Sequence, residues 1–229
     1  MTHSTIKPTP FHSPPTNLER AALCPCALPN ESPLDMKPTV ILDAGHGIET
    51  KGKRSPVWAD GAQLMEYAFN RDIVSRIAKG LAEANHPYCL LVPEDTDIPL
   101  SERCARANNI WNATQQNAYL ISIHANAGGG RGWECFTSVG ETQSDAIATL
   151  FCAQAQKVFI GKRMRFEHCD GDPDKESPFY LLRHTHCPAV LTENFFMDTE
   201  SDCRYIMSQE GRDTIARMHL EAIQQIDSI

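Results

Sequence analysis

The chain lacks the features that mark several classes of protein. No apolar run approaches the roughly 20 residues that a membrane-spanning helix requires. The nine cysteines include no Cys-x-x-Cys pair, which argues against a zinc ribbon, and their scattered positions favour synthesis in a reducing compartment. Positive charge is also scarce, because 21 lysines and arginines face 29 acidic residues and leave a net charge of −8. This balance argues against nucleic acid and anionic membrane surfaces as partners.

The first 38 residues differ from the rest in their density of proline. Eight of the 15 prolines fall here, at positions 8, 10, 14, 15, 25, 29, 33 and 38. Proline blocks helices and central strands, so we expect a flexible tail over 1–38 and one folded domain over 39–229. The only apolar patch of the tail, Ala21–Leu23, is much shorter than the apolar part of a signal peptide. The tail therefore holds no recognisable signal peptide and leaves the export route open.

From Thr39 onward, strand patterns alternate with helix patterns. The expected strands are Thr39–Asp43, Tyr88–Val92, Tyr119–Ile123, Gly132–Thr137 and Pro188–Thr192. The expected helices are Leu64–Asn85, Leu100–Asn112 and Ser144–Phe159, and the spacing of Thr199 to Asp202 predicts a capping box that opens the closing helices. The alternation predicts a single α/β domain of the phosphorylase/hydrolase-like kind, with a mostly parallel, twisted sheet and helices on both faces.

Three of the expected strands lead into ionisable side chains. The first is followed by His46, which stands between two glycines, and two later strands end at His124 and Glu193. The carboxyl ends of parallel strands meet at one edge of a sheet, where open α/β sheets bind ligands. Glu66 lies in the first turn of the helix after the first strand and faces the same edge. We therefore expect these four side chains to converge there.

Two histidines and two glutamates at one edge suit a zinc hydrolase. Zinc accepts imidazole nitrogen and carboxylate oxygen, and a catalytic zinc uses three protein ligands and leaves a position for water. The remaining carboxylate is then free to act as a base. Either histidine taken singly is more simply explained as an ordinary hydrogen-bonded residue, so the hypothesis depends on the convergence of all four.

These residues also carry a resemblance to a known family. Over roughly Thr39–Ile226 the sequence resembles the zinc-dependent N-acetylmuramoyl-L-alanine amidases of the cell-division, sporulation and phage-lysin type. The matching motifs are Leu42-Asp43-Ala44-Gly45-His46-Gly47, Glu66 with Asn70, Leu100-x-x-Arg103-x-x-x-x-Asn108, Ser122-Ile123-His124-Ala125-Asn126 and Pro188-Ala189-Val190-Leu191-Thr192-Glu193. The resemblance implies one zinc ion per chain, bound by His46, Glu66 and His124, with Glu193 as the catalytic carboxylate. The implied substrate is the peptidoglycan amide between N-acetylmuramic acid and L-alanine of the stem peptide.

The resemblance also implies a location and has limits. It implies action at the cell wall or in the periplasm, and release of the phage or prophage type accords with the missing signal. The chain departs from the family at Ala44, where proline is common, and at Asn194-Phe195-Phe196, where a glycine-phenylalanine pair is usual. Neither departure touches the metal-binding set. The 193 − 124 = 69 positions from His124 to Glu193 leave no room for the inhibitory helix of some division-type members.

Other hypotheses remain open on the sequence alone. One is a zinc peptidase that cuts elsewhere on the stem peptide, and another is a wall-binding module without activity, although a binder needs no base at Glu193. The stretch 170–176 resembles the start of a calcium loop, but Lys175 and Leu181 stand where an EF-hand needs glycine and glutamate, so a solvated acidic loop is expected. The pair His184-x-His186 could bind a metal ion, but because it precedes the last strand, it is expected to cap a neighbouring element or fill space beside it. Arg103 is expected to pair with Asp97, and the sequence does not indicate the oligomeric state.

Overall fold

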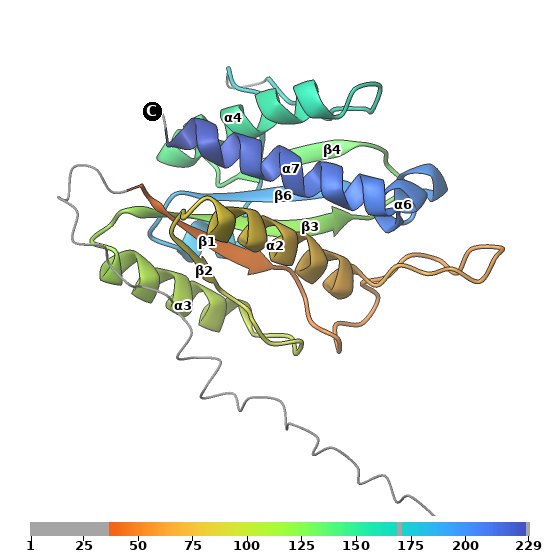
Figure 1. Cartoon of the computed structure of the whole chain (residues 1–229), viewed down its shortest axis with the longest axis horizontal. Coiled ribbons are helices and arrows are strands. Elements are labelled where there is room, and N and C mark those ends of the chain that lie inside the picture. Colours follow the sequence, from red (N-terminus) through yellow and green to blue (C-terminus); the bar gives the residue numbers. More distant parts are fainter. Residues whose placement is uncertain (1–36, 169–170, 228–229) are drawn as a thin grey trace, which may run out of the picture.

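The computed structural model describes residues 37–168 and 171–227. Its six-stranded sheet has the order β2-β1-β3-β6-β4-β5 (Figure 1). The strands are β1 (Thr39–Ala44), β2 (Tyr88–Leu90), β3 (Ala118–Asn126), β4 (Trp133–Thr137), β5 (Lys175–Glu176) and β6 (Ala189–Phe196). The first four strands in this order run parallel, whereas β4 is antiparallel to β6. The mostly parallel α/β sheet is thus confirmed. The tail expected over 1–38 lies almost wholly outside the described residues and stays a prediction.

Helices cover both faces of the sheet, as predicted. One face carries α2 (Glu66–Glu83), α4 (Gln143–Val158), α6 (Glu200–Met207) and α7 (Gln209–Ile226). The other carries α3 (Leu100–Ala113) and α5 (Tyr180–His184). Figure 1 shows α2 and α7 side by side across the sheet, where they contact each other. The apolar stripe Phe69, Ile73, Ile77 and Leu81 of α2 is buried in this layer, which explains why a helix forms there.

The two strands that carry His124 and Glu193 are longer than the sequence indicates. We expected them to end where the first ionisable residue appears, but β3 continues to Asn126 and β6 to Phe196. The backbone positions of His124 and Glu193 are paired with each other across β3 and β6. Both residues therefore lie near the carboxyl ends of their strands but inside the sheet, where hydrogen bonds fix the backbone.

The capping box predicted at Thr199–Asp202 is wrong. Thr199 precedes α6, but its hydroxyl donates to the carbonyl oxygen of Gly130 at 2.6 Å and caps nothing. The Asp202 carboxylate accepts from the backbone amides of Gly132 at 2.7 Å and Phe196 at 3.3 Å. Both side chains tie the loop before β4 to the end of β6. A capping box does form at the start of α4, between Thr142 and Asp145.

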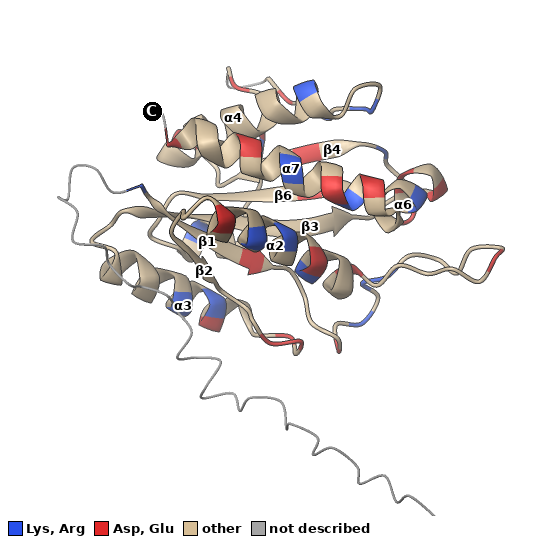
Figure 2. Cartoon of the chain, in the orientation of Figure 1, with Lys and Arg blue, Asp and Glu red and all other residues tan. Residues whose placement is uncertain are grey.

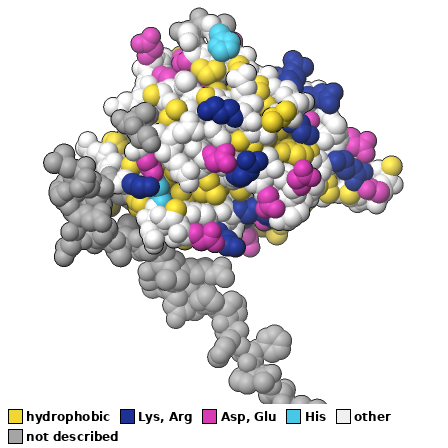
Figure 3. Space-filling model, turned by 45° about the horizontal axis from the view of Figure 1, so that its top comes forward, with side chains coloured by type: hydrophobic (Ala, Val, Ile, Leu, Met, Phe, Trp, Pro, Cys, Tyr) yellow, Lys and Arg dark blue, Asp and Glu magenta, His cyan; other side chains and the backbone are white. Residues whose placement is uncertain are grey.

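The described residues have a surface of mixed charge and buried cysteines. Figure 3 shows basic and acidic side chains interspersed over the visible face, without a continuous basic patch. Across the described segments, no helix is both long enough and apolar enough to span a membrane. The six cysteines within these segments are buried and form no disulfide bond with one another, at positions 89, 104, 135, 152, 187 and 203.

Candidate metal centre and active site

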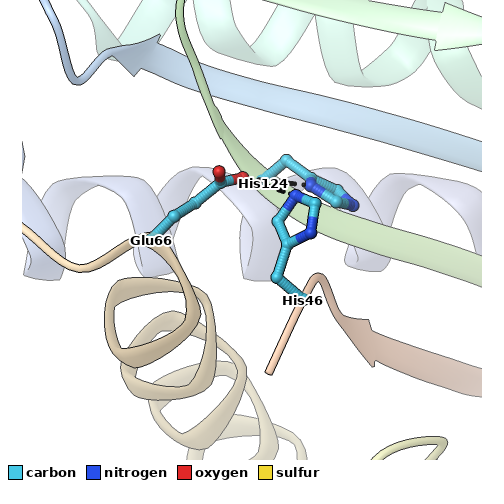
Figure 4. A group of neighbouring side chains, drawn as sticks. All are labelled: His46, Glu66 and His124. Atoms are coloured by element: carbon cyan, nitrogen blue, oxygen red, sulfur yellow. Dashed lines mark hydrogen bonds and ion pairs between the residues drawn. The ribbon is translucent and has the colours of Figure 1, made fainter. Parts of the chain in front are cut away.

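Three side chains from separate segments meet at the carboxyl edge of the sheet (Figure 4). His46 follows β1, Glu66 is the first residue of α2, and His124 lies on β3. Glu66 Oε1 lies 3.3 Å from His46 Nε2 and 3.2 Å from His124 Nδ1. Two ligands bound to one tetrahedral zinc ion lie about 3.4 Å apart, given bond lengths near 2.1 Å. The structure therefore brings together the three residues predicted as metal ligands, at separations that suit one ion.

Two ligand atoms of this group make no hydrogen bond, which also fits a metal ion. His46 Nε2 and Glu66 Oε2 are buried atoms that make no hydrogen bond. Buried polar atoms are normally hydrogen-bonded, so two buried atoms without hydrogen bonds at one place indicate a binding site for a ligand such as a metal ion. Glu66 is 1% exposed, whereas the side chains of His46 and His124 keep 18% and 16% of their area exposed. A small part of the group is thus open to solvent and substrate.

The two imidazoles control the charge of Glu66. Burial alone raises the pKa of this carboxyl, but the adjacent imidazoles of His124 and His46 outweigh it and hold the pKa well below its usual range. Burial lowers the pKa of His124, yet its hydrogen bond to Glu66 and the charge of Glu193 raise it overall. Glu66 is therefore an anion, which is the form that binds a metal ion.

The glycines on either side of His46 are required by close packing. A Cβ atom on Gly45 would lie 2.1 Å from Cε1 of His124, and one on Gly47 would lie 2.1 Å from the backbone nitrogen of Asp97. His46 itself has a φ of 62°, in the left-handed region that few side chains adopt. The sharp turn and the absent Cβ atoms together place the two imidazoles in contact.

A buried ion pair lies directly beneath this turn. Arg103 donates to Asp43 Oδ1 at 2.7 Å and to the carbonyl oxygen of Ala44 at 2.8 Å, and Ser122 donates to Asp43 Oδ2 at 2.6 Å. The expected pairing of Arg103 with Asp97 is present at 3.2 Å. The sequence analysis missed Asp43 as the main partner. The signal was an acid at the end of a core strand, because a buried charge needs a charged partner.

Two asparagines of the matching motifs form hydrogen bonds with the backbone and are not part of the predicted metal-binding set. Asn70 donates to the carbonyl oxygen of Gly45 at 3.0 Å and so supports the turn that carries His46. Asn108 donates to the carbonyl oxygen of His184 at 3.1 Å and accepts from the backbone amide of His186 at 2.7 Å. Within the described part of the chain, neither of these two histidines belongs to a cluster of metal ligands.

Glu193 lies on β6 in register with His124 and is only partly exposed. Its Oε2 atom makes no hydrogen bond. Burial, together with the charges of Glu66 and Glu134, raises the pKa of Glu193 to about 7, although the nearby charges of His124 and Lys53 oppose this rise. A carboxyl with such a pKa both accepts and releases a proton near neutral pH, as a general base that later acts as an acid must do.

Two further charged residues lie near the site, and the sequence analysis did not single them out. Lys53 comes from the long loop before α2, and its Nζ lies 3.9 Å from Glu66 Oε2. Glu134 lies on β4 directly opposite Glu193, and Arg165 and Lys175 both bind its carboxylate. An acid amid the apolar residues of the strand was the available signal for Glu134. Nothing in the pattern distinguishes Lys53 from the other lysines of its loop.

Comparison with known proteins identifies the family of the chain. Residues 40–225 match the model of a family described as N-acetylmuramoyl-L-alanine amidase. The sporulation-specific N-acetylmuramoyl-L-alanine amidase of Bacillus subtilis is 29% identical over 190 residues, which cover 81% of this chain and 67% of that protein. The endolysin of Bacillus phage SPP1 is 30% identical over 200 residues, which cover 83% and 66% respectively. The chain thus spans about two thirds of the length of these relatives.

A solved structure shows the same fold. The crystal structure of N-acetylmuramoyl-L-alanine amidase from Clostridium difficile 630 is 25% identical and superposes with a TM-score of 0.69. The match covers 83% of this chain and 96% of that one. With the family model matched over most of its length, the chain belongs to the N-acetylmuramoyl-L-alanine amidases, a family of cell-wall hydrolases.

Proposed function

We propose that this chain hydrolyses the peptidoglycan amide between N-acetylmuramic acid and L-alanine, with one zinc ion bound by His46, Glu66 and His124. The observation that carries the proposal is the convergence of these three side chains next to the strand that carries Glu193. Two of the three have buried ligand atoms that make no hydrogen bond. Two imidazoles and one carboxylate are a ligand set typical of catalytic zinc.

The residues divide the chemistry between holding the metal and moving a proton. Zinc, when bound, supplies a Lewis acid that acidifies water and offsets negative charge on the scissile carbonyl oxygen. Glu193 takes the proton from the attacking water and then delivers it to the leaving amine. The pair Arg103–Asp43 and the side chain of Asn70 hold the turn that orients His46. Catalysis in this proposal depends on one proton carrier, Glu193.

The same proposal covers the catalytic domain and its location. We assign the catalytic domain to residues 39–229, of which 40–225 match the family model. A sporulation amidase and a phage endolysin are both among the relatives, and either role places the substrate outside the cell membrane. Release of the phage type predicts that the chain stays inside intact producing cells. Fractionation of such cells tests this, and efficient export of the full-length chain on its own would contradict it.

Mass spectrometry of digested peptidoglycan tests the reaction itself. An amidase creates new ends at the lactyl group of N-acetylmuramic acid and at L-alanine. A peptidase creates new ends within the peptide, and a binding module creates none. The Glu193→Gln variant is the matched control, because it retains the shape of the site but accepts no proton. Peptide ends or no products from the zinc-loaded chain would reject the proposal.

A further inference from the structure

A second group of acids lies away from the metal centre. Asp145 is in the first turn of α4, and Asp172 and Asp174 are in the loop that precedes β5. One carboxylate oxygen from each of the three lies within 4.8 Å of the others. Figure 1 shows the loop passing beside α4, and Figure 2 shows acidic positions in it. The expectation of a wholly solvated acidic loop is therefore wrong for these residues.

Asp174 is the buried centre of the group. It is 2% exposed, and its Oδ2 accepts a hydrogen bond from the Thr137 hydroxyl at 2.8 Å. Oδ1 of Asp174 and Oδ1 of Asp172 are both buried, and neither atom makes a hydrogen bond. Burying carboxylate oxygens without donors is costly, and such oxygens are normally hydrogen-bonded, ion-paired or bound to a metal ion.

The surrounding charges do not relieve this cost. Burial, together with the neighbouring carboxylates of Asp172 and Asp145, raises the pKa of Asp174 to about 7, although the Thr137 hydroxyl opposes this rise. The adjacent Lys175 does not compensate, because its ammonium group binds the carboxylate of Glu134. Either a shared proton or a cation must therefore hold these oxygens together.

We propose that Asp145, Asp172 and Asp174 bind a calcium ion. The three side chains offer only oxygen, the ligand of hard cations, and no nitrogen or sulfur that would favour zinc. Calcium takes six to eight oxygen ligands, so water or backbone oxygens complete its shell. One shared proton neutralises only one of the three carboxylates, so negative charge remains in the group. Because the ligands come from a helix and a separate loop, comparison with the continuous loop of an EF-hand does not reveal this site.

The position of the group links it to the sheet. Asp174 immediately precedes β5, the edge strand that pairs with β4. The next residue, Lys175, binds Glu134, which lies opposite Glu193 on the neighbouring strand. Calcium bound to Asp174 would therefore fix β5 against β4 and α4 and thereby hold Lys175 in place beside the active site.

Thermal unfolding of the zinc-loaded full chain tests the proposal. The protein is first dialysed against resin-treated buffer, and calcium chloride is then added. Saturating calcium should raise Tm by about 5 °C or more, because an ion that binds only the folded state stabilises it. Asp172→Asn and Asp174→Asn should abolish most of this rise. Glu141→Gln changes an exposed acid nearby and should behave like the natural chain.

Calorimetric titration with calcium gives the second measurement. It should show one site per zinc-loaded chain in the natural protein and in Glu141→Gln, and none in Asp172→Asn. Asp172 is partly exposed, so its variant remains informative if Asp174→Asn fails to fold. An unchanged Tm in calcium would mean that a shared proton holds the acids together and would overturn the proposal. An equal rise in Asp172→Asn, or protection by magnesium but not calcium, would also overturn it.

Discussion

The two groups of potential metal ligands differ in the neighbours of their most buried member. Glu66 lies between two imidazoles, and its pKa is held well below the usual range. Asp174 lies beside two carboxylates, and its pKa is raised to about 7. Burial raises the pKa of both, so the partners alone decide the direction of the net shift. The partners also determine which metal ion each group suits. A group with imidazole nitrogen and carboxylate oxygen suits zinc, whereas a group with oxygen ligands alone suits calcium.

The largest effect should follow from removing an imidazole from the first cluster. His46→Ala and His124→Ala should each lower zinc content well below one per chain and reduce hydrolysis to background, because each removes a ligand. Elemental analysis and muropeptide hydrolysis measure the two effects. His184→Ala, an exposed histidine outside the cluster, should change neither. Full zinc in both of the first two variants would place the metal elsewhere.

The two glutamates of the site should respond differently to the same change. Glu193→Gln should keep its zinc and lose about 10²–10⁴-fold in rate, which is what a general base typically contributes. Glu66→Gln should lose zinc together with activity, because it weakens a metal bond. Zinc stoichiometry and hydrolysis rate, measured on both variants, separate ligand from base. Loss of zinc in Glu193→Gln with retention in Glu66→Gln would reverse the two roles.

Replacing Arg103 tests whether a charged partner determines the energetic cost of burying the carboxylate of Asp43. Arg103→Met leaves Asp43 buried without its cation and should lower the free energy of unfolding by about 3–5 kcal/mol. Arg106→Met is the matched control, since this more exposed arginine pairs with Glu94 and Glu102 and should cost only about 1 kcal/mol or less. Urea unfolding measures both. Equal losses would show that burial of the pair does not matter.

His219 extends the comparison to a buried histidine without a carboxylate partner. Burial lowers its pKa from the ordinary histidine value of 6.5 to about 4. The native state therefore keeps it neutral, and the unfolded chain binds a proton first as pH falls. Its contribution to stability is present above about pH 6.5 and is lost as pH falls toward 4, with a full size of about 3 kcal/mol.

Urea unfolding between about pH 7 and pH 4 measures this contribution. His219→Gln should flatten the pH dependence of stability in that window, although it lowers stability at neutral pH through the lost contact of His219 Nε2 with the Thr192 hydroxyl. An unchanged slope in the variant would show that another group titrates there.

The smallest effect is expected from the proline-rich tail. The residues predicted to bind metal in both clusters all lie in the described part of the chain, so deletion of residues 1–36 should leave hydrolysis nearly unchanged and shift Tm by no more than a few degrees. Side-by-side thermal melts of the full and shortened chains measure this. A larger fall would mean that the tail packs on the domain.

The sequence was sufficient for what depends on local pattern. The apolar run of β1, the stripe on α2 and the glycines around His46 each have a direct structural cause that is visible in the chain. Parallel strands then required His46 and His124 to meet at one edge. Glu66 joined them because the helix after β1 begins at that edge.

What the sequence could not provide depends on pairing between distant segments. The strand carrying Glu193 extends beyond the residue because β3 and β4 pair with it on both sides. Thr199 and Asp202 have capping spacing but find partners in a distant loop. Asp145 joins Asp172 and Asp174 only through the packing of that loop against α4. Spacing along the chain carries no information about such contacts.

The strand order has a consequence for the synthesis of the protein. β6 is the last strand in the sequence, yet it lies between β3 and β4 in the sheet. A nascent chain that has reached residue 188 holds all three predicted zinc ligands but lacks both Glu193 and the strand that joins β4 to β3. Its sheet is in two parts, and its metal centre lacks the proposed base. If Glu193 acts as proposed, hydrolysis begins only after β6 has been synthesised, and products that terminate before Ala189 are inactive.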